Sequence, residues 1–285
     1  HATNHTQPRC HSFTNELNLK QNSSTMKQNF FPKTIIQALG LIFISILIAS
    51  PFFFLQKQIN ISQQLFLNVF FILFSSIIIL ISFLINRKRG IKHEINIRIN
   101  NIRLIPLMVL VIYFFQVGVS KPIFHLIGLF NEEVTPLNNP IDASIHWMGL
   151  ILLAPILEEI IFRGIVLKGF LINYNPKKAI LLSAIVFGIV HMEPTQVINA
   201  FIIGLFFGWI YYKTKSILIT MILHFIANSS VFIQSILYYK YADPNTVTKI
   251  SIYIIPISLI LISVMLNRLI KNIKPKLVEN QQNTD

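Results

Sequence analysis

Apolar residues come in long, nearly uninterrupted stretches along most of the chain, and polar residues collect in short segments between them. A helix needs about 20 mostly apolar residues to cross a bilayer. We therefore expect eight membrane-spanning helices, at residues 34–55, 61–85, 104–120, 145–171, 179–196, 197–213, 216–238 and 249–270. The fifth and sixth are short, and only Pro194 separates them. The pattern predicts an all-α fold, a polytopic membrane helix bundle.

Composition and charge agree with this prediction. The chain is 53% hydrophobic and only 12% charged, with a mean hydropathy of +0.62, which excludes an ordinary soluble domain. A net charge of +13 could suggest a nucleic-acid partner, but the basic residues lie in short loops beside apolar spans and do not share one helical face. We therefore expect no nucleic-acid partner.

The distribution of the basic residues supports eight spans. With that count, 18 of the 24 basic residues fall on one side of the membrane, four on the other and two in the N-terminal tail. By the positive-inside rule, both termini are then cytoplasmic. We expect a multi-pass protein of a bacterial plasma membrane, whose surroundings are the lipid bilayer. The single cysteine, Cys10, rules out an internal disulfide.

Three ionisable residues interrupt the fourth apolar stretch: Glu158, Glu159 and Arg163. Each charge at membrane depth costs about 2.5 to 3.5 kcal/mol on insertion scales, so such residues need partners or a function. Glu159 and Arg163 are four residues apart and share a helical face, whereas Glu158 is turned about 100° away. We expect Glu159 to pair with Arg163, which a structural salt bridge would explain, and Glu158 to face another polar cluster.

Later spans offer such a cluster. His191 follows Phe187 by four residues, near the middle of the fifth expected span, and His224 precedes Asn228 by four in the seventh. Taken singly, each histidine is more often a satisfied core residue, and an asparagine in a span often makes an interhelical hydrogen bond. Polar residues at similar depth on three helices favour a common site. Gly204 and Gly208, also four residues apart, indicate close helix packing.

These side chains suit peptide-bond hydrolysis without a covalent intermediate. A carboxylate in a cavity of low dielectric constant can act as the general base toward water, and a neighbouring histidine can orient that water. His224 and Asn228 could stabilise the oxyanion. The alternative is a zinc site held by Glu158, His191 and His224. The usual H-E-x-x-H pair is absent, so we expect no cofactor and keep zinc as the alternative.

The ordered motifs Glu158-Glu159-x-x-x-Arg163, Phe187-x-x-x-His191 and His224-x-x-x-Asn228 resemble those of the CPBP intramembrane proteases, also called the CAAX prenyl protease 2 or Abi family. Members include eukaryotic prenyl endopeptidases, bacteriocin self-immunity proteins and lysostaphin-resistance-like proteins. The resemblance covers about residues 145–240 and includes the glycine-bearing segment 201–212. Single motifs would be weak, but their order and separations within apolar helices are specific.

The resemblance implies roles for these residues. Glu158 would activate the water with help from His191, Glu159 and Arg163 would hold the site, and His224 and Asn228 would form the oxyanion hole. Members are often named metalloproteases, although the prenyl protease is better described as glutamate-dependent. The substrate would be a peptide or a membrane protein, cleaved within or near the cytoplasmic leaflet.

The chain then divides into five regions. We expect a disordered or non-native tail at 1–33, with Met26 as a candidate start, N-terminal spans at 34–120 and an extracytoplasmic loop at 121–144. Residues 121–130 of that loop are expected to form an amphipathic surface helix. The protease-like catalytic core covers 145–240, and the last span with a basic cytoplasmic tail covers 241–285.

Two functions compete with a protease. A non-proteolytic membrane regulator or bacteriocin immunity protein could keep the same residues for helix packing and bind a partner. A transporter could use the carboxylates as a proton relay, but internal repeats and broken-helix signals are absent from the sequence.

Overall fold

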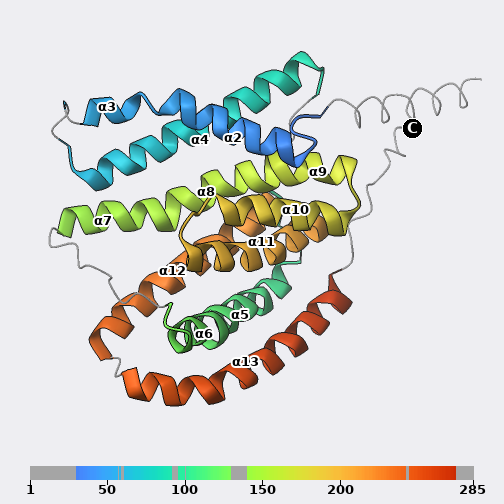
Figure 1. The fold of residues 1–285 in the computed structure, drawn as a ribbon. Helices are drawn as coiled ribbons and strands as arrows, with labels where there is room; N and C mark the ends of the chain where they lie inside the picture. The colour runs from blue at the N-terminus through green and yellow to red at the C-terminus, as the bar shows by residue number, and fades with distance from the viewer. Residues whose placement is uncertain are drawn as a thin grey trace, which may run out of the picture.

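A computed structural model describes residues 30–56, 58, 61–91, 96–99, 101–129, 140–241 and 244–273, with the side chains of 140–142 and 235–248 excepted. Regular structure within these ranges is helical throughout, which confirms the expected all-α bundle. Two helical layers flank a central pair of helices (Figure 1). The elements are α2 (Ile35–Ala49), α3 (Phe52–Gln56), α4 (Gln63–Lys88), η1 (Ile102–Leu104), α5 (Ile105–Phe115), η2 (Gln116–Ser120), α6 (Lys121–Leu126), α7 (Pro140–Met148), η3 (Gly149–Leu153), α8 (Ala154–Glu159), η4 (Ile160–Leu167), α9 (Lys168–Asn173), α10 (Pro176–Ile189), α11 (Pro194–Thr214), α12 (Ile217–Tyr241) and α13 (Pro244–Asn272).

Six helices within the described residues are long and apolar enough to cross a membrane. They are Ile35–Gln56, Gln63–Lys88, Ile102–Leu126, Pro194–Thr214, Ile217–Gln234 and Lys249–Asn272. Each overlaps an expected span. α10 has 14 residues, so its length of about 21 Å is short of a hydrocarbon core of about 30 Å. The polytopic bundle is therefore confirmed, whereas the count of eight stays a prediction.

The boundary between the fifth and sixth expected spans was placed wrongly. α10 ends at Ile189, and Pro194 is the first residue of α11, with Glu193 as its N-cap. Proline at the start of a helix leaves no backbone donor unsatisfied, so Pro194 begins α11 and does not end α10. His191 consequently lies in the turn after α10, not near the middle of a span.

The fourth expected span is a continuous run of helical segments, and it extends over 140–173 rather than 145–171. Two of its segments, η3 and η4, are π-helical. Another π-helical segment, η2, joins α5 to α6. Residues 121–130, expected as a separate surface helix, therefore begin as α6, which continues directly from the third span. π-Turns are rare and frequently mark functional sites.

The end of the expected N-terminal tail is folded against the bundle. Phe30 is 1% exposed. The backbone N–H of Phe31 donates to Oδ1 of Asn86, and Nδ2 of Asn86 donates back to the carbonyl oxygen of Phe31, at 2.8 and 2.7 Å. Gly169 lies so close to the carbonyl oxygen of Pro32 that a side chain would not fit. Residues 30–33 therefore belong to the folded protein, while residues 1–29 of that tail lie outside the described residues.

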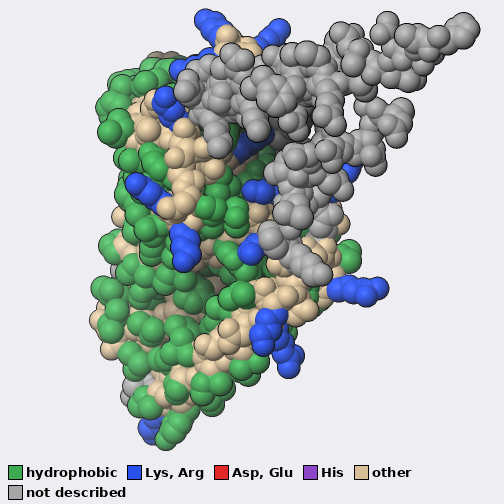
Figure 2. Space-filling view, turned by 90° about the vertical axis from the view of Figure 1, so that its right-hand side faces the viewer, with side chains coloured by type: hydrophobic (Ala, Val, Ile, Leu, Met, Phe, Trp, Pro, Cys, Tyr) green, Lys and Arg blue, Asp and Glu red, His purple; other side chains and the backbone are tan. Residues whose placement is uncertain are grey.

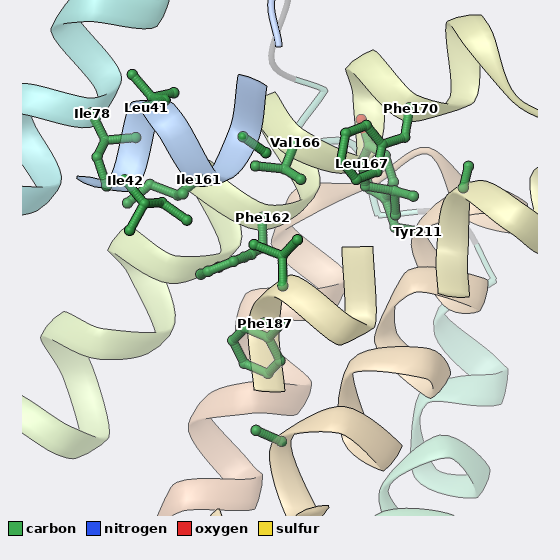
Figure 3. Packing of buried hydrophobic residues seen from close by; sticks show 14 of the residues in the cluster. Leu41, Ile42, Ile78, Ile161, Phe162, Val166, Leu167, Phe170, Phe187 and Tyr211 are labelled. Atoms are coloured by element: carbon green, nitrogen blue, oxygen red, sulfur yellow. The ribbon is translucent and has the colours of Figure 1, made fainter. Parts of the chain in front are cut away.

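The central pair of helices packs closely through glycine. A Cβ added at Gly204 of α11 would lie 3.0 Å from Cδ1 of Phe187 and 3.3 Å from Cα of Ala184, both on α10. One added at Gly208 would lie 3.1 Å from Cγ2 of Ile180. The packing role expected for the two glycines is confirmed. Phe187 belongs to the buried cluster in Figure 3, which joins α10 and α11 to α2, α4 and η4.

One end of the bundle carries lysine and arginine. The C-terminal ends of α4 and α13 and the α9–α10 connection lie at the right of Figure 1. The face seen from that side shows Lys and Arg side chains and, among the residues described, no acidic one (Figure 2). This gathering at one end is the pattern that the positive-inside rule describes. The orientation of the termini in the membrane remains a prediction, and both termini lie outside the described residues.

Candidate active site

Glu159 and Arg163 form the ion pair expected from their spacing. Nη1 of Arg163 donates to Oε1 of Glu159 at 2.8 Å, and the two residues are 1% and 0% exposed. The helix geometry differs from the one assumed, because the π-helical segment η4 begins at Ile160, directly after Glu159. Residues four apart remain neighbours in this wider turn, so the prediction of the pair is confirmed.

The guanidinium of Arg163 also lies against two aromatic rings. Its Cζ is 4.6 Å from the ring centroid of Phe187 and 5.4 Å from that of Phe207. Aromatic faces attract cations, and this attraction is stronger where water is excluded. Phe187 and Phe207, from α10 and α11, therefore help to hold a buried charge that would otherwise be costly.

His224 from α12 makes a second contact with Glu159. Its Nδ1 lies 2.9 Å from Oε1 of Glu159. A carboxylate paired with arginine is an acceptor, so Nδ1 carries the proton and donates. The ring of His224 lies 6.0 Å from that of Phe187 and 5.6 Å from that of Phe207. The same two aromatic rings therefore position His224 and Arg163.

Glu158 faces the other nitrogen of that histidine. Nε2 of His224 lies 3.9 Å from Oε2 of Glu158, too long for a direct hydrogen bond. Oε2 of Glu158 is buried and accepts no hydrogen bond from any described group. The Glu158 side chain is 16% exposed, against 0% for that of Glu159. As expected, Glu159 pairs with Arg163 and Glu158 faces another polar residue; they also differ in exposure, although Oε2 of Glu159 likewise accepts no hydrogen bond from a described group.

His191 caps the end of α10. Its Nδ1 lies 2.7 Å from the carbonyl oxygen of Phe187, and its ring meets the Phe187 ring edge-on at 4.9 Å. A carbonyl only accepts, so Nδ1 carries the proton and Nε2 is left as an acceptor in the neutral ring. The hydrogen bond satisfies a carbonyl in the last turn of the helix. His191 therefore makes a hydrogen bond that stabilises the end of α10. Its ring contacts the Phe187 ring, which also contacts the ring of His224.

Asn228 also has a structural hydrogen bond. Its Nδ2 donates to the carbonyl oxygen of Leu150, in η3, at 2.7 Å. This is the interhelical hydrogen bond that is common for asparagine in membranes. An amide nitrogen carries two hydrogens, so one donor of Asn228 remains available after this contact.

The sequence analysis missed Thr220. It is fully buried on α12, one turn before His224. Its hydroxyl donates to the carbonyl oxygen of Ile217 at 2.9 Å and lies near the Glu159 carboxylate. The spacing of Thr220, His224 and Asn228 at intervals of four is the signal that could have identified it. Nothing in the sequence distinguishes Phe207 from the other aromatic residues of its helix.

The alternative zinc set can be compared with this geometry. Within the described residues, no three His, Cys, Asp or Glu side chains are placed to hold a metal ion together. In both histidines Nδ1 is hydrogen-bonded, to Glu159 in His224 and to a backbone carbonyl in His191, so Nε2 is the nitrogen that could bind a metal. As they are placed, Glu158, His191 and His224 do not form a three-ligand site.

Comparison with known proteins places these residues in a recognised segment. Residues 140–230 match the model of the family described as type II CAAX prenyl endopeptidase Rce1-like. That segment contains all six candidate site residues: Glu158, Glu159, Arg163, His191, His224 and Asn228. The match supplies the family of the segment and leaves the role of each residue open.

Two bacterial proteins are similar in sequence. "UPF0177 protein YajF" of Lactococcus lactis subsp. lactis (strain IL1403) is 30% identical over 206 residues, which cover 67% of this chain and 92% of that protein. "Putative membrane peptidase YdiL" of Bacillus subtilis (strain 168) is 34% identical over 85 residues, covering 30% of this chain and 35% of that protein. No solved structure matches the chain.

Proposed function

Since the chain belongs to the CPBP family of intramembrane proteases, we propose that it is an endopeptidase that hydrolyses peptide bonds with a water molecule activated by Glu158. One observation carries the proposal: Glu158 is 16% exposed and presents a carboxylate oxygen without a hydrogen-bond donor, 3.9 Å from Nε2 of His224, whereas Glu159 is fully buried and its Oε1 is bonded to Arg163 and His224. A carboxylate of this kind suits a general base.

In this mechanism Glu158 takes one proton from water as the oxygen of that water attacks the substrate carbonyl carbon. The proton then passes to the leaving amine, so the products are a carboxylic acid and an amine, and Glu158 is again a carboxylate. Nε2 of His191 is an acceptor and would orient the same water. Glu159 and Arg163 keep the site in place and take no part in proton transfer.

The oxyanion would be stabilised by His224 and Asn228. His224 donates through Nδ1 to Glu159, and with both ring nitrogens protonated it would donate from Nε2 to the oxygen of the reacting carbonyl. Asn228 would contribute the amide hydrogen that Leu150 does not use. Preorganised donors of this kind are each worth about 2.7 to 4 kcal/mol of transition-state stabilisation.

The substrate class follows from the location. Spans surround the site, so the substrate is a peptide or a membrane-anchored protein that approaches through the bilayer or at its surface. One relative bears the name "Putative membrane peptidase YdiL", and the matching family is described as type II CAAX prenyl endopeptidase Rce1-like. We propose a peptide pheromone, bacteriocin or membrane protein as the substrate, cleaved within or near the cytoplasmic leaflet.

A non-proteolytic membrane regulator or immunity protein is the second candidate. The hydrogen bonds of His191 and Asn228 to backbone carbonyls favour it, because such bonds would be kept for helix packing alone. Both residues could nevertheless serve catalysis, because His191 retains Nε2 as an acceptor and Asn228 retains a second amide hydrogen.

The test compares wild type with Glu158→Gln, which preserves shape and removes the base. Membrane and secreted peptide pools should differ, with uncleaved substrate accumulating in the variant at a wild-type protein level. Glu193→Gln is the matched control, because this carboxylate is exposed and caps α11 outside the site. If Glu158→Gln leaves both the peptide pools and the cellular phenotype unchanged while the protein level holds, the protease proposal fails and the regulator is favoured.

A further inference from the structure

The helix that carries the two glutamates contains a carbonyl that its own backbone cannot satisfy. In an α-helix the N–H of Ala154 would bond to the oxygen of Leu150, but in η3 it bonds to Gly149 instead. The next residue, Pro155, has no N–H. The carbonyl oxygen of Leu150 therefore needs an outside donor, and Asn228 of α12 supplies it at 2.7 Å.

A second asparagine acts at the other end of the same π-helical segment. Asn68, on α4, donates from Nδ2 to the carbonyl oxygen of Ile145 at 2.8 Å, across 77 positions of the sequence. Ile145 lies one turn before η3. The contact is close: a Cβ added at Gly149, the first residue of η3, would lie 2.1 Å from Oδ1 of Asn68. Only glycine admits the asparagine there.

The π-turn determines the direction in which the carboxylates point. Each residue of an α-helix advances the chain by about 100° around the axis. A π-turn holds one residue more than an α-turn, so it shifts the phase of all that follows by about that angle relative to an uninterrupted α-helix. Glu158 and Glu159 follow η3 by a single turn, in α8. Without the π-turn, Glu158 would leave the neighbourhood of His224.

We propose that Asn68 is a positioning residue: by capping Ile145 and packing on Gly149, it holds η3 in the π form and thereby directs Glu158 toward His224. Asn228 supports the same turn from the opposite side. The effect on cleavage rests on the proposed protease function. The effect of Asn68 on the direction of Glu158 does not, and it can be tested without a substrate.

The geometric test uses a pair of cysteines. In a Cys10→Ser background, Glu158→Cys and His224→Cys should be joined by a short bifunctional thiol reagent in native membranes. Adding Asn68→Leu, which removes the donor at similar size, should lower the yield about tenfold, because the loss of one buried hydrogen bond shifts the two helix forms by about that factor. Ile156→Cys with His224→Cys is the control pair, since Ile156 is 46% exposed on another face of α8 and should stay unlinked.

A deletion separates this role from simple stabilisation. Removing Leu152, inside η3, converts the π-turn to an α-turn and leaves the phase on both sides unchanged. The cross-link should then persist even with Asn68→Leu. Removing Ile156 from α8 instead rotates the helix and should abolish the link. If Asn68→Leu leaves the yield at the wild-type level, or if the Leu152 deletion does not rescue it in folded protein, the proposal is wrong.

Activity provides the link to function. If Glu158→Gln blocks cleavage, Asn68→Leu should lower the turnover number about tenfold with little change in KM, and the Leu152 deletion should restore it. If Asn68→Leu affects the cross-link while Glu158→Gln changes no peptide, the positioning role stands and the protease function fails. If Glu158→Gln blocks cleavage while Asn68→Leu alters neither the cross-link yield nor the turnover number, the protease function stands and the positioning role fails.

Discussion

The imidazole of His224 is bonded to Glu159, not to Glu158: Nδ1 of the histidine lies 2.9 Å from Oε1 of Glu159. The same carboxylate oxygen accepts from Arg163 at 2.8 Å. Glu159 is therefore the common acceptor that orients two side chains from two segments. It follows that the adjacent acids should respond differently to mutation.

Glu159→Gln should destabilise the protein, and Glu158→Gln should not. Glutamine at 159 leaves the buried guanidinium of Arg163 without its counter-charge, which typically costs about 3 to 5 kcal/mol. Thermal unfolding of purified protein in detergent should show a much lower midpoint for Glu159→Gln. Equal midpoints for the two variants would contradict the assignment of Glu159 as the structural acid.

Arg163→Lys should also weaken the site although it preserves the charge. Lysine presents a compact ammonium and cannot place a planar group against the rings of Phe187 and Phe207. We expect a loss of about 1 to 2 kcal/mol in unfolding free energy. Lys178→Arg, at an exposed cation–π contact with Tyr174, serves as the control and should be neutral.

Gly204→Val should lower stability and loosen Phe187. The added side chain would press on Cδ1 of Phe187 and on Ala184 of α10. Overpacking of this kind costs about 1 to 3 kcal/mol. Gly40→Ala on α2 is the control, because a Cβ there meets nothing within 4 Å, and alanine should leave stability unchanged or raise it slightly. Similar unfolding midpoints for Gly204→Val and wild type would show that α10 and α11 can move apart without loss of stability.

Glu193→Ala should destabilise α11 at neutral pH by about 0.5 to 2 kcal/mol, as expected for loss of an N-cap. Burial opposes ionisation of Glu193, but donors from Thr195 and the backbone N–H of Gln196 outweigh it and lower the pKa of this carboxyl. A group whose pKa is lowered by folding stabilises the protein above its unfolded pKa, and this is lost as the pH falls through the folded pKa.

The difference between wild type and Glu193→Ala should therefore shrink in acid, below the ordinary carboxyl pKa. Unfolding measured at several pH values checks this. A difference that is the same at every pH would mean that the cap does not act through the ionised carboxylate.

Prolonged chelation should leave cleavage intact in purified protein, since the proposed mechanism uses Glu158 and water. The measurement is turnover together with the metal content of the protein. Loss of activity that added zinc restores would instead favour the alternative zinc set of Glu158, His191 and His224.

The sequence was informative where one rule dominates. Apolar stretches have to become helices in lipid, because backbone groups find no partner there except along the helix. The pair of Glu159 and Arg163 was predicted from helical spacing alone, and it formed. The position of His191 was predicted wrongly, because it depends on where α10 ends. The proline that follows begins the next helix, and the sequence alone does not show whether a proline ends one helix or begins another.

The sequence by itself thus determined the helical membrane bundle and the set of ionisable residues that the spans would bring together. Tertiary structure alone decided which nitrogen of His224 meets which acid, and that Asn68 and Asn228 cap a π-turn before Glu158. The reason is physical: periodicity within a helix follows from local geometry, whereas an interruption of that periodicity is maintained by donors from other helices. Those donors become neighbours only when the chain has folded.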